Sequence, residues 1–278
     1  MANIDSKDVK KLRDKTNAGM MDCKRALEQA NGDLVEAESI LRKKGINTAA
    51  KKAGREAREG AIAACIHEQG RVGVLVEINC ETDFVAKNDS FKEFTARIAS
   101  LLAADADADY EQLRVDAVAS IGENILISRH QRFELGGSGL VASYIHLAGK
   151  VGVLVEVSCE SDQVASSEVF RELVKDITLH IAASHPSHVS RDEVAESELA
   201  REREIYAAQV EGKPASIIDT IVGGKLDKYL SGICLLEQAF VKDPDKTVQT
   251  LLDEKSRELG ETIAIQRFIR YQLGEETA

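Results

Sequence analysis

Two stretches of the chain place a thiol beside carboxylates, a combination that could do chemistry. They are CETDFVAKND, from Cys80 to Asp89, and CESDQVASSE, from Cys159 to Glu168. A cysteine thiolate can act as a nucleophile, and a carboxylate can act as a general acid or base. No histidine lies near either cysteine in sequence, and a cysteine at a strand end is more often buried and inert. We therefore expect structural thiols, and a thiol hydrolase that uses Cys80 stays as an alternative.

The two stretches differ at the position that follows the acid. Phe84 comes directly after Asp83, whereas Gln163 takes the corresponding place in the second stretch. An aromatic ring where a strand hands over to a helix could be a wedge for another protein, or a plug in the core. Spacing alone favours the plug, because loop aromatics often pack back on their own domain.

Length, composition and net charge limit the possible functions further. The chain has 278 residues, is 44% apolar and carries a net charge of −11. Such an acidic chain does not suit nucleic acid as its main partner, because phosphate binding needs a surplus of Lys and Arg. The basic run from Arg42 to Arg58 is interpreted as a solvated linker rather than an RNA-binding arm. The glycines form no phosphate-binding loop and no histidine pair has metal spacing, so we expect no cofactor.

Cysteine usage and hydropathy indicate a location. The chain has no C-x-x-C pair, and its thiols are dispersed, which is typical of reduced cysteines in the cytosol. The N-terminus has no apolar leader, and no apolar run is long enough to span a bilayer. The sequence therefore predicts a cytoplasmic protein without a membrane partner. The dispersed thiols are Cys23, Cys65, Cys80, Cys159 and Cys234.

The elements that carry the two stretches are duplicated. GAIAACIHEQGRVGVLVEINCETDFVAKNDSFKEF, from Gly60, aligns without gaps with GLVASYIHLAGKVGVLVEVSCESDQVASSEVFREL, from Gly139. Each copy has two runs rich in β-formers around a short turn, which predicts a β-hairpin. A helical run follows. In the first copy it has these apolar residues at helical spacing: Phe91, Phe94, Ile98 and Leu102.

A second alignment completes each copy with another strand. IGENILISRHQRFELG, from Ile121, matches LGETIAIQRFIRYQLG, from Leu259. Each copy then has the order β-β-α-α-β, and the second copy holds 59 extra residues between about Ser184 and Asp245. We expect a duplicated α+β core with two antiparallel three-stranded sheets and their helices.

The extra residues favour a helical hairpin. Ser190 is the predicted cap of its first helix. Gly212-Lys213-Pro214 stops that helix and starts the next. Apolar stripes and charged outer faces predict an antiparallel coiled coil that projects from the body.

The N-terminal segment predicts three short helices in a small bundle. Ser6 is the predicted cap of the first helix, and Met20 to Ala30 forms the second. Asp33 caps a third helix from Leu34 to Lys44.

The predicted fold is therefore α+β and multidomain. Its units are a helical domain at 1–45, a basic linker at 46–59, core subdomain 1 at 60–138 and core subdomain 2 at 139–278. The second subdomain includes the hairpin at 187–232 and a C-terminal module at 233–278. Whether the linker is ordered stays open.

Several motifs together resemble the elongation factor Ts family, the bacterial and organellar nucleotide exchange factors for elongation factor Tu. They are VKKLRDKTNAGMMDCKRALEQANGDLVEAESILRKKG, TDFVAKND, IGEN at Ile121 and GKP at Gly212. The resemblance covers essentially the whole chain, in the family's order. It implies a ubiquitin-associated-like (UBA-like) N-terminal domain, a two-subdomain core, a coiled-coil hairpin and a C-terminal module.

The resemblance also implies which residues bind elongation factor Tu. Asp83 and Phe84 would enter the partner's GTPase domain near its magnesium and phosphate site, so the resemblance favours the wedge over the plug. Ile121-Gly122 would form a second patch, although Gly122 could also end a helix. His146 would make a contact from the second copy. The full predicted set is Arg13, Met20, Met21, Thr82, Asp83, Phe84, Val85, Ile121, Gly122 and His146.

By the same resemblance, the N-terminal members of that set would contact one helix of the partner's GTPase domain. Adjacent methionines such as Met20 and Met21 suit an adaptable surface. We expect one of the two to belong to the bundle's own core.

The resemblance thus implies an exchange factor in translation elongation, without covalent chemistry of its own. A ubiquitin-like-binding or scaffold protein, acting through the N-terminal bundle and the hairpin, is the alternative from another class. Whether the chain and its partner form a homodimer of heterodimers stays open.

Overall fold

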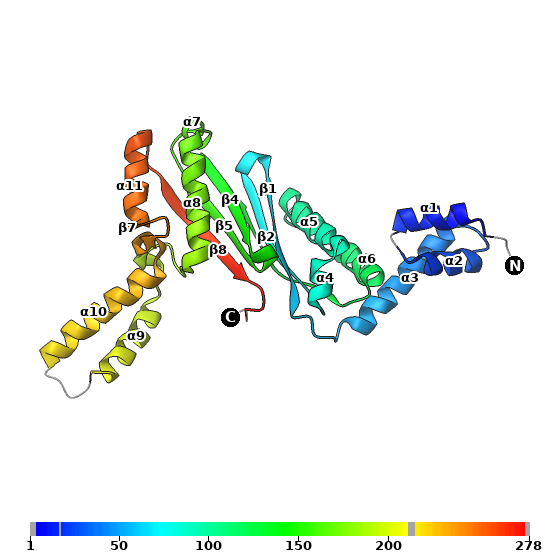
Figure 1. Cartoon of the computed structure of the whole chain (residues 1–278), viewed down its shortest axis with the longest axis horizontal. Helices are drawn as coiled ribbons and strands as arrows, with labels where there is room; N and C mark the ends of the chain where they lie inside the picture. Colours follow the sequence, from blue (N-terminus) through cyan, green and yellow to red (C-terminus); the bar gives the residue numbers. More distant parts are fainter. Residues whose placement is uncertain (1–3, 17, 211–214, 276–278) are drawn as a thin grey trace.

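The computed structural model describes residues 4–16, 18–210 and 215–275. The chain forms an elongated body of helices and sheets, with one helical unit at each end (Figure 1). The helices are α1 Ser6–Thr16, α2 Met20–Gln29, α3 Leu34–Lys52, α4 Asp83–Lys87, α5 Asp89–Ala104, α6 Glu111–Ile121, α7 Asp162–Ala165, α8 Glu168–Ser184, α9 Glu196–Ala208, α10 Ala215–Ile233 and α11 Val248–Leu259. The strands are β1 Glu59–His67, β2 Val72–Cys80, β3 Ile125–Glu134, β4 Gly139–His146, β5 Val151–Ser158, β6 Ala239–Phe240, β7 Asp243–Thr247 and β8 Ala264–Gln272.

The body contains two three-stranded antiparallel sheets built on one plan. Their strand orders are β1-β2-β3 and β4-β5-β8. Both sheets have a register shift at the same place in the repeat, Glu77/Ile78 in one and Glu156/Val157 in the other. The predicted mixed α+β fold, its duplication and its antiparallel three-stranded sheets are confirmed.

The two sheets pack against each other, and helices cover their outer faces (Figure 1). Every residue of β2 is buried, because α5 covers one face of its sheet and the second sheet covers the other. The predicted stripe of α5 faces this core, since all four of its residues are buried: Phe91, Phe94, Ile98 and Leu102.

Equivalent glycines lie where the sheets meet. A Cβ on Gly73 would come within 2.5 Å of Val141 and 2.8 Å of Leu154. A Cβ on Gly152 would meet Ile62 at 2.5 Å and Leu75 at 2.8 Å. Since real Cβ atoms do not approach so closely, an alanine at either position would force these packed side chains to shift.

One arginine from each sheet makes a contact with the other sheet. Arg129 on β3 donates to buried Glu77 at 2.7 Å, and its guanidinium lies 4.1 Å from the ring centroid of Tyr271 in the other sheet. Arg267 on β8 repeats this arrangement with Glu156 at 2.7 Å and Phe133 at 4.3 Å. Each arginine therefore joins an ion pair within its own sheet to a cation–π contact with the other.

The N-terminal helices α1 to α3 pack around their own small apolar cluster, which includes Leu12, Cys23 and Leu27. Asp33 accepts hydrogen bonds from the N–H groups of Val35 and Glu36, so the predicted cap of the third helix is confirmed. The predicted Ser6 cap is wrong by one position.

The cap of α1 is Asp5, whose carboxylate accepts from the Lys7 N–H at 2.9 Å. Ser6 is instead the first residue of the helix. A carboxylate at this position also interacts favourably with the positive end of the helix dipole, and a serine hydroxyl has no charge to do so.

The third helix is longer than predicted, because α3 ends at Lys52 and not at Lys44. The first half of the expected 46–59 linker, up to Lys52, is therefore helical. Gly45 does not stop the helix, since it is buried where α3 crosses α6 and lies against Val115 and Ala119. The glycine allows a close helix–helix approach, and this tertiary contact outweighs its low helix propensity.

Two substitutions at Gly45 should have opposite effects. A Cβ there would lie 3.5 Å from Val115 and 3.6 Å from Ala119, which is ordinary contact. We expect Gly45→Ala to keep or raise the free energy of unfolding by up to ~1 kcal/mol, through helix propensity. Gly45→Leu should lower it by ~1–3 kcal/mol by forcing the helices apart. Urea denaturation measures both, and a stable Leu variant would contradict the close approach.

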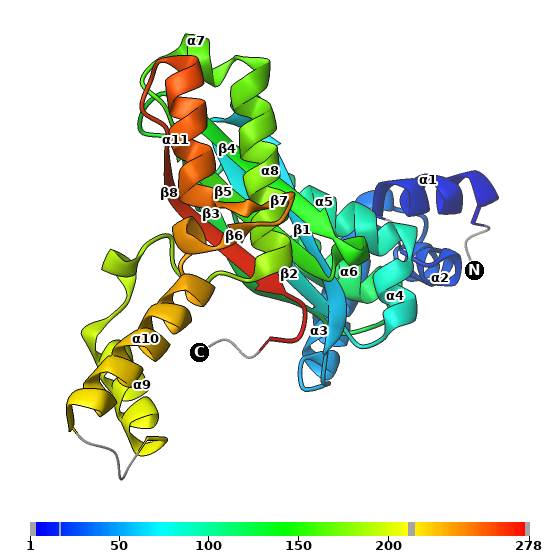
Figure 2. The same cartoon turned by 60° about the vertical axis from the view of Figure 1, so that its left-hand side comes forward.

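The helices α9 and α10 form the unit at the opposite end, and both views show it projecting from the body (Figures 1 and 2). The predicted stripes face each other in a cluster of Tyr206, Val210, Ile218, Ile221, Val222 and Leu226. The Ser190 cap is wrong: a 3₁₀ turn at Arg191–Glu193 intervenes, and α9 begins at Glu196. The Gly212-Lys213-Pro214 signal lies outside the described residues.

The chain returns to the body through an element that the sequence did not predict, the short β6–β7 hairpin. His180 of α8 is fully buried beside it and accepts from the Val241 N–H at 3.2 Å. Across the described ranges, every helix is too short or too polar to cross a membrane.

Candidate functional site

In the first copy, an aromatic side chain is exposed on the turn between β2 and α5. Phe84 has 82% of its surface exposed, on the first turn of the short helix α4. Val85 and Ala86, beside it, pack against the core. The plug interpretation of Phe84 is therefore wrong: its neighbours anchor the turn and the ring points to solvent.

The acid before the ring is tied to its own helix. The Asp83 carboxylate accepts a hydrogen bond from Lys87 Nζ at 2.7 Å. This bond lowers the pKa of Asp83 below its ordinary value. Asp83 is thus ionised at neutral pH, and it places a negative charge beside an exposed ring.

A carboxylate from a distant part of the chain holds this turn by accepting hydrogen bonds from it. Glu123 accepts from the backbone N–H groups of Glu81 and Thr82, both at 3.0 Å. It also accepts from the Thr82 hydroxyl at 2.7 Å, and that hydroxyl caps α4 by accepting from the Val85 N–H at 3.3 Å.

The contact is reciprocal. The Glu81 carboxylate accepts from the Asn124 N–H at 2.6 Å, and this bond lowers the pKa of Glu81. The β2–α4 turn and the α6–β3 turn therefore hold each other. We call these two turns and their carboxylate bonds the carboxylate clasp.

The second copy has the same clasp. Glu261 accepts from the N–H groups of Glu160 and Ser161, both at 3.0 Å, and from the Ser161 hydroxyl. Glu160 accepts from the Thr262 N–H at 3.1 Å. At the tip of this turn is Gln163, which is exposed. The two copies therefore share the support and differ in the side chain that it presents.

Gly122 ends α6 in the left-handed conformation, with φ +88°. Gly260 ends α11 in the same way, with φ +72°. The structural role of Gly122 as a helix cap is thus confirmed, and it sets the direction in which Glu123 leaves the helix.

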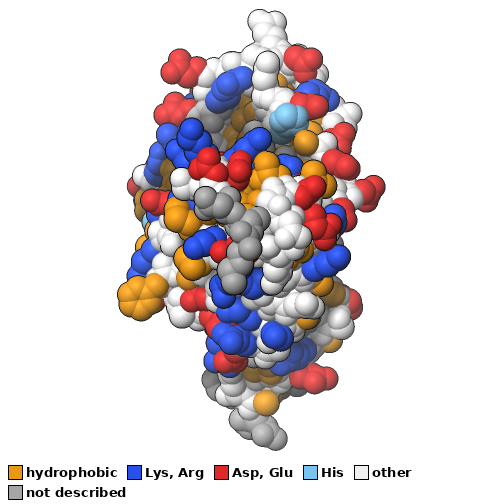
Figure 3. Space-filling view, turned by 90° about the vertical axis from the view of Figure 1, so that its right-hand side faces the viewer, with side chains coloured by type: hydrophobic (Ala, Val, Ile, Leu, Met, Phe, Trp, Pro, Cys, Tyr) orange, Lys and Arg blue, Asp and Glu red, His pale blue; other side chains and the backbone are white. Residues whose placement is uncertain are grey.

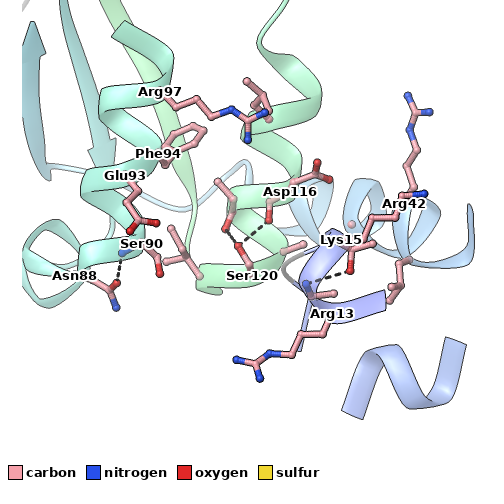
Figure 4. Close-up of a pocket in the computed structure, with 18 of the residues that line it drawn as sticks. Arg13, Lys15, Arg42, Asn88, Ser90, Glu93, Phe94, Arg97, Asp116 and Ser120 are labelled. Atoms are coloured by element: carbon pink, nitrogen blue, oxygen red, sulfur yellow. Dashed lines mark hydrogen bonds between the residues drawn. The ribbon is translucent and has the colours of Figure 1, made fainter. Parts of the chain in front are cut away.

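A groove lies between the N-terminal helices and the first copy, with a volume of about 720 Å³. Arg13, Val85 and Ile121 line it, so the structure brings these three predicted residues together. Arg13 and Arg42 come from one wall, and Glu93, Arg97 and Asp116 belong to the other (Figure 4).

Basic, acidic and hydrophobic side chains are interspersed on this end of the molecule (Figure 3). Met20 and Met21 are 54% and 62% exposed, and neither lines the groove. The expectation that one methionine is core is wrong. The buried side of α2 is formed by Cys23, Ala26 and Leu27 instead.

His146 lies apart from these residues, at the end of β4 in the second sheet. Its ring is stacked on that of Tyr144, with the Tyr144 hydroxyl 3.1 Å from its Nδ1. His146 is exposed and lines a separate cavity of about 400 Å³ with Lys150 and Arg270.

The thiols do not form a reactive centre. Cys80 is fully buried, and its thiol donates to the Thr82 carbonyl at 3.2 Å. Burial raises the pKa of Cys80 to about 12, and it also raises that of Cys159. Among the described residues, no cluster of His, Cys, Asp and Glu could hold a metal ion. The geometry therefore disfavours the thiol hydrolase.

Thiol labelling of the native protein at neutral pH should separate the cysteines. We expect Cys65 to react first, because it is partly exposed and the other four thiols are buried. Cys80 should react only after unfolding, since a buried neutral thiol is a poor nucleophile. Peptide mass spectrometry after a short pulse of iodoacetamide measures this order, and fast labelling of Cys80 would revive the hydrolase hypothesis.

Similarity to known proteins covers nearly the whole chain. A family model described as "Elongation factor TS" matches residues 81–275. The chain is 46% identical to elongation factor Ts of Trichlorobacter lovleyi, over 98% of this chain and 93% of that protein. Elongation factor Ts of Clostridium perfringens has the same identity and coverage. The Nitratidesulfovibrio vulgaris protein of that name is 41% identical, over 97% and 96% of the two chains.

Proposed function

This chain belongs to the elongation factor Ts family, and from that premise we propose that it is a guanine nucleotide exchange factor for elongation factor Tu. It would accelerate GDP release so that GTP can rebind during translation elongation in the cytoplasm. No bond is made or broken by the factor itself, and neither nucleic acid nor membrane is needed as a partner.

The observation that carries this proposal is the exposed ring of Phe84 on a turn with a buried support. A GTPase holds Mg²⁺ and the phosphates through a few precisely oriented oxygens and backbone donors. A rigid ring pushed between the partner's helices would displace these groups. The Asp83 carboxylate beside the ring would accept hydrogen bonds from the partner and fix the direction of entry.

Acceleration then follows from differential binding. A factor that binds nucleotide-free elongation factor Tu better than the GDP form must itself be weakened by nucleotide, in the same ratio. Rebinding of GTP would therefore expel the factor and let it act again. One molecule of the factor would therefore act on many molecules of elongation factor Tu, although no covalent step occurs.

We assign the wider contact surface to the groove and its surroundings, and we add His146, which lies apart from them on a separate cavity. Its proposed members are the N-terminal residues Arg13, Met20 and Met21, the turn residues Thr82, Asp83, Phe84 and Val85, the patch Ile121-Gly122, and His146 in the second copy. The N-terminal unit at 1–45 would be UBA-like, and the hairpin at 187–232 a coiled coil. The remaining unit boundaries are proposed as 60–138, 139–278 and 233–278.

GDP release tests the proposal directly. Fluorescent GDP bound to elongation factor Tu is chased with excess GDP in a stopped-flow instrument, with and without this protein. We expect strong acceleration at substoichiometric amounts. Unchanged release would overturn the proposal, and binding of a ubiquitin-like protein in its place would favour the scaffold alternative.

A further inference from the structure

The support of the Phe84 turn depends on one carboxylate. Three hydrogen bonds converge on Glu123, from two backbone N–H groups and the Thr82 hydroxyl. Bonds to an ionised acceptor are about twice as strong as neutral ones. Without Glu123, two N–H groups at the start of the turn and the hydroxyl that caps α4 would lose their acceptor.

The carboxylate is itself fixed in place. It follows Gly122, whose left-handed conformation ends α6, and precedes Asn124, which is fully buried. Asn124 donates to the Arg55 carbonyl at 2.8 Å, and Lys52 at the end of α3 donates to the Gly122 carbonyl. The segment at the end of α3 therefore anchors the α6–β3 turn, in addition to its bond with Glu81.

The helix that carries the ring cannot hold its own shape. With five residues, α4 is far shorter than the length at which a helix is stable alone. An unsupported turn would have to be ordered when the partner binds, and that entropy would reduce the binding energy available to displace nucleotide.

From these contacts we propose that Glu123 is a positioning residue for nucleotide exchange. It does not touch the partner; it holds the β2–α4 turn so that Phe84 and Asp83 are presented in one orientation. The inference rests on the proposed exchange function. It assigns part of the rate to a residue 39 positions away from Phe84 in sequence.

The second copy supplies a matched control inside the same molecule. Glu261 receives the corresponding bonds from Glu160 and Ser161, but its turn presents Gln163 in place of an aromatic ring. Removing either carboxylate should lower the midpoint of thermal unfolding by a similar amount. Only the loss of Glu123 should slow exchange.

The experiment compares full-length Glu123→Ala, Glu123→Gln, Glu261→Ala and Phe84→Ala with the double variant Glu123→Ala/Phe84→Ala. The readouts are the maximal GDP release rate at saturating factor and the midpoint of thermal unfolding. We expect Glu123→Ala to lower the rate about tenfold, and Glu123→Gln, which keeps one acceptor oxygen, to lie in between. In the Phe84→Ala background, Glu123→Ala should cost much less than tenfold, because the ring is gone and only Asp83 is left to position.

Several results would overturn the inference. They are a wild-type rate for Glu123→Ala, an equal slowing by Glu261→Ala, or a full additional loss in the double variant. If Glu123→Ala does not fold, the same comparisons are made with Glu123→Gln and Glu261→Gln. Wild-type protein that fails to accelerate release overturns the exchange function and this inference together, whereas slowing by Phe84→Ala without slowing by Glu123→Ala overturns the inference alone.

Discussion

Replacing Phe84 with Ala lowers the maximal rate of GDP release by about 30-fold or more, while the thermal midpoint hardly changes. Truncation of a central interface aromatic commonly costs at least ~2 kcal/mol of binding, and a factor that works through differential binding loses rate accordingly. The fold should be unaffected because the ring is 82% exposed, and surface substitutions usually change stability by less than ~0.5 kcal/mol.

The control for this prediction is Gln163→Ala, at the equivalent tip of the second copy. Its turn has the same support, so the variant tests whether any exposed tip residue contributes to exchange. We expect the rate to stay within about twofold of the wild type. A large rate defect in Gln163→Ala would contradict the single wedge, and a large stability loss in Phe84→Ala would mean that the ring packs on its own domain.

The second large effect concerns stability. Arg129→Ala should lower the free energy of unfolding by ~3–5 kcal/mol, the range seen when one member of a buried ion pair is removed. The Glu77 side chain is only 5% exposed, so its charge would be left buried without its partner. The cation–π contact with Tyr271 would be lost as well. Guanidinium chloride denaturation at pH 7 measures the difference.

Arg267→Ala is the matched variant in the other sheet. The Arg267 side chain is 47% exposed, so solvent screens its pair with Glu156 and a smaller loss of ~1 kcal/mol is expected. Equal losses in the two variants would contradict the assignment of the larger effect to burial of Glu77.

The duplicated sheets could be predicted because two long segments of the sequence align and each has runs of β-formers, and the α5 core because its apolar residues recur at helical spacing. Helical spacing reports which face of a helix is buried. The length of α3 could not be predicted, because Gly45 resembles a helix stop. It is kept helical by Val115 and Ala119, which are distant in sequence. Caps were misplaced where a neighbouring acid or a 3₁₀ turn competed for the helix start.

The candidate site was predictable only in part for the same reason. The family motif pointed to the Phe84 turn, but its exposure depends on Val85 and Ala86 facing the core instead. Glu123 was missed because its three bonds join residues more than 40 positions apart. One signal was available: an acid follows the helix-ending glycine in both IGEN and LGET.

The two clasps also bear on how such a protein could acquire a new activity. Since Phe84 and Gln163 stand on supports with the same bonds, the tip residue is decoupled from folding. After an ancestral duplication, mutations at one tip could be sampled by drift with little risk to the native state. The same property makes the second turn a ready site for grafting: an engineer could install a recognition side chain at position 163 and leave the rest of the molecule alone.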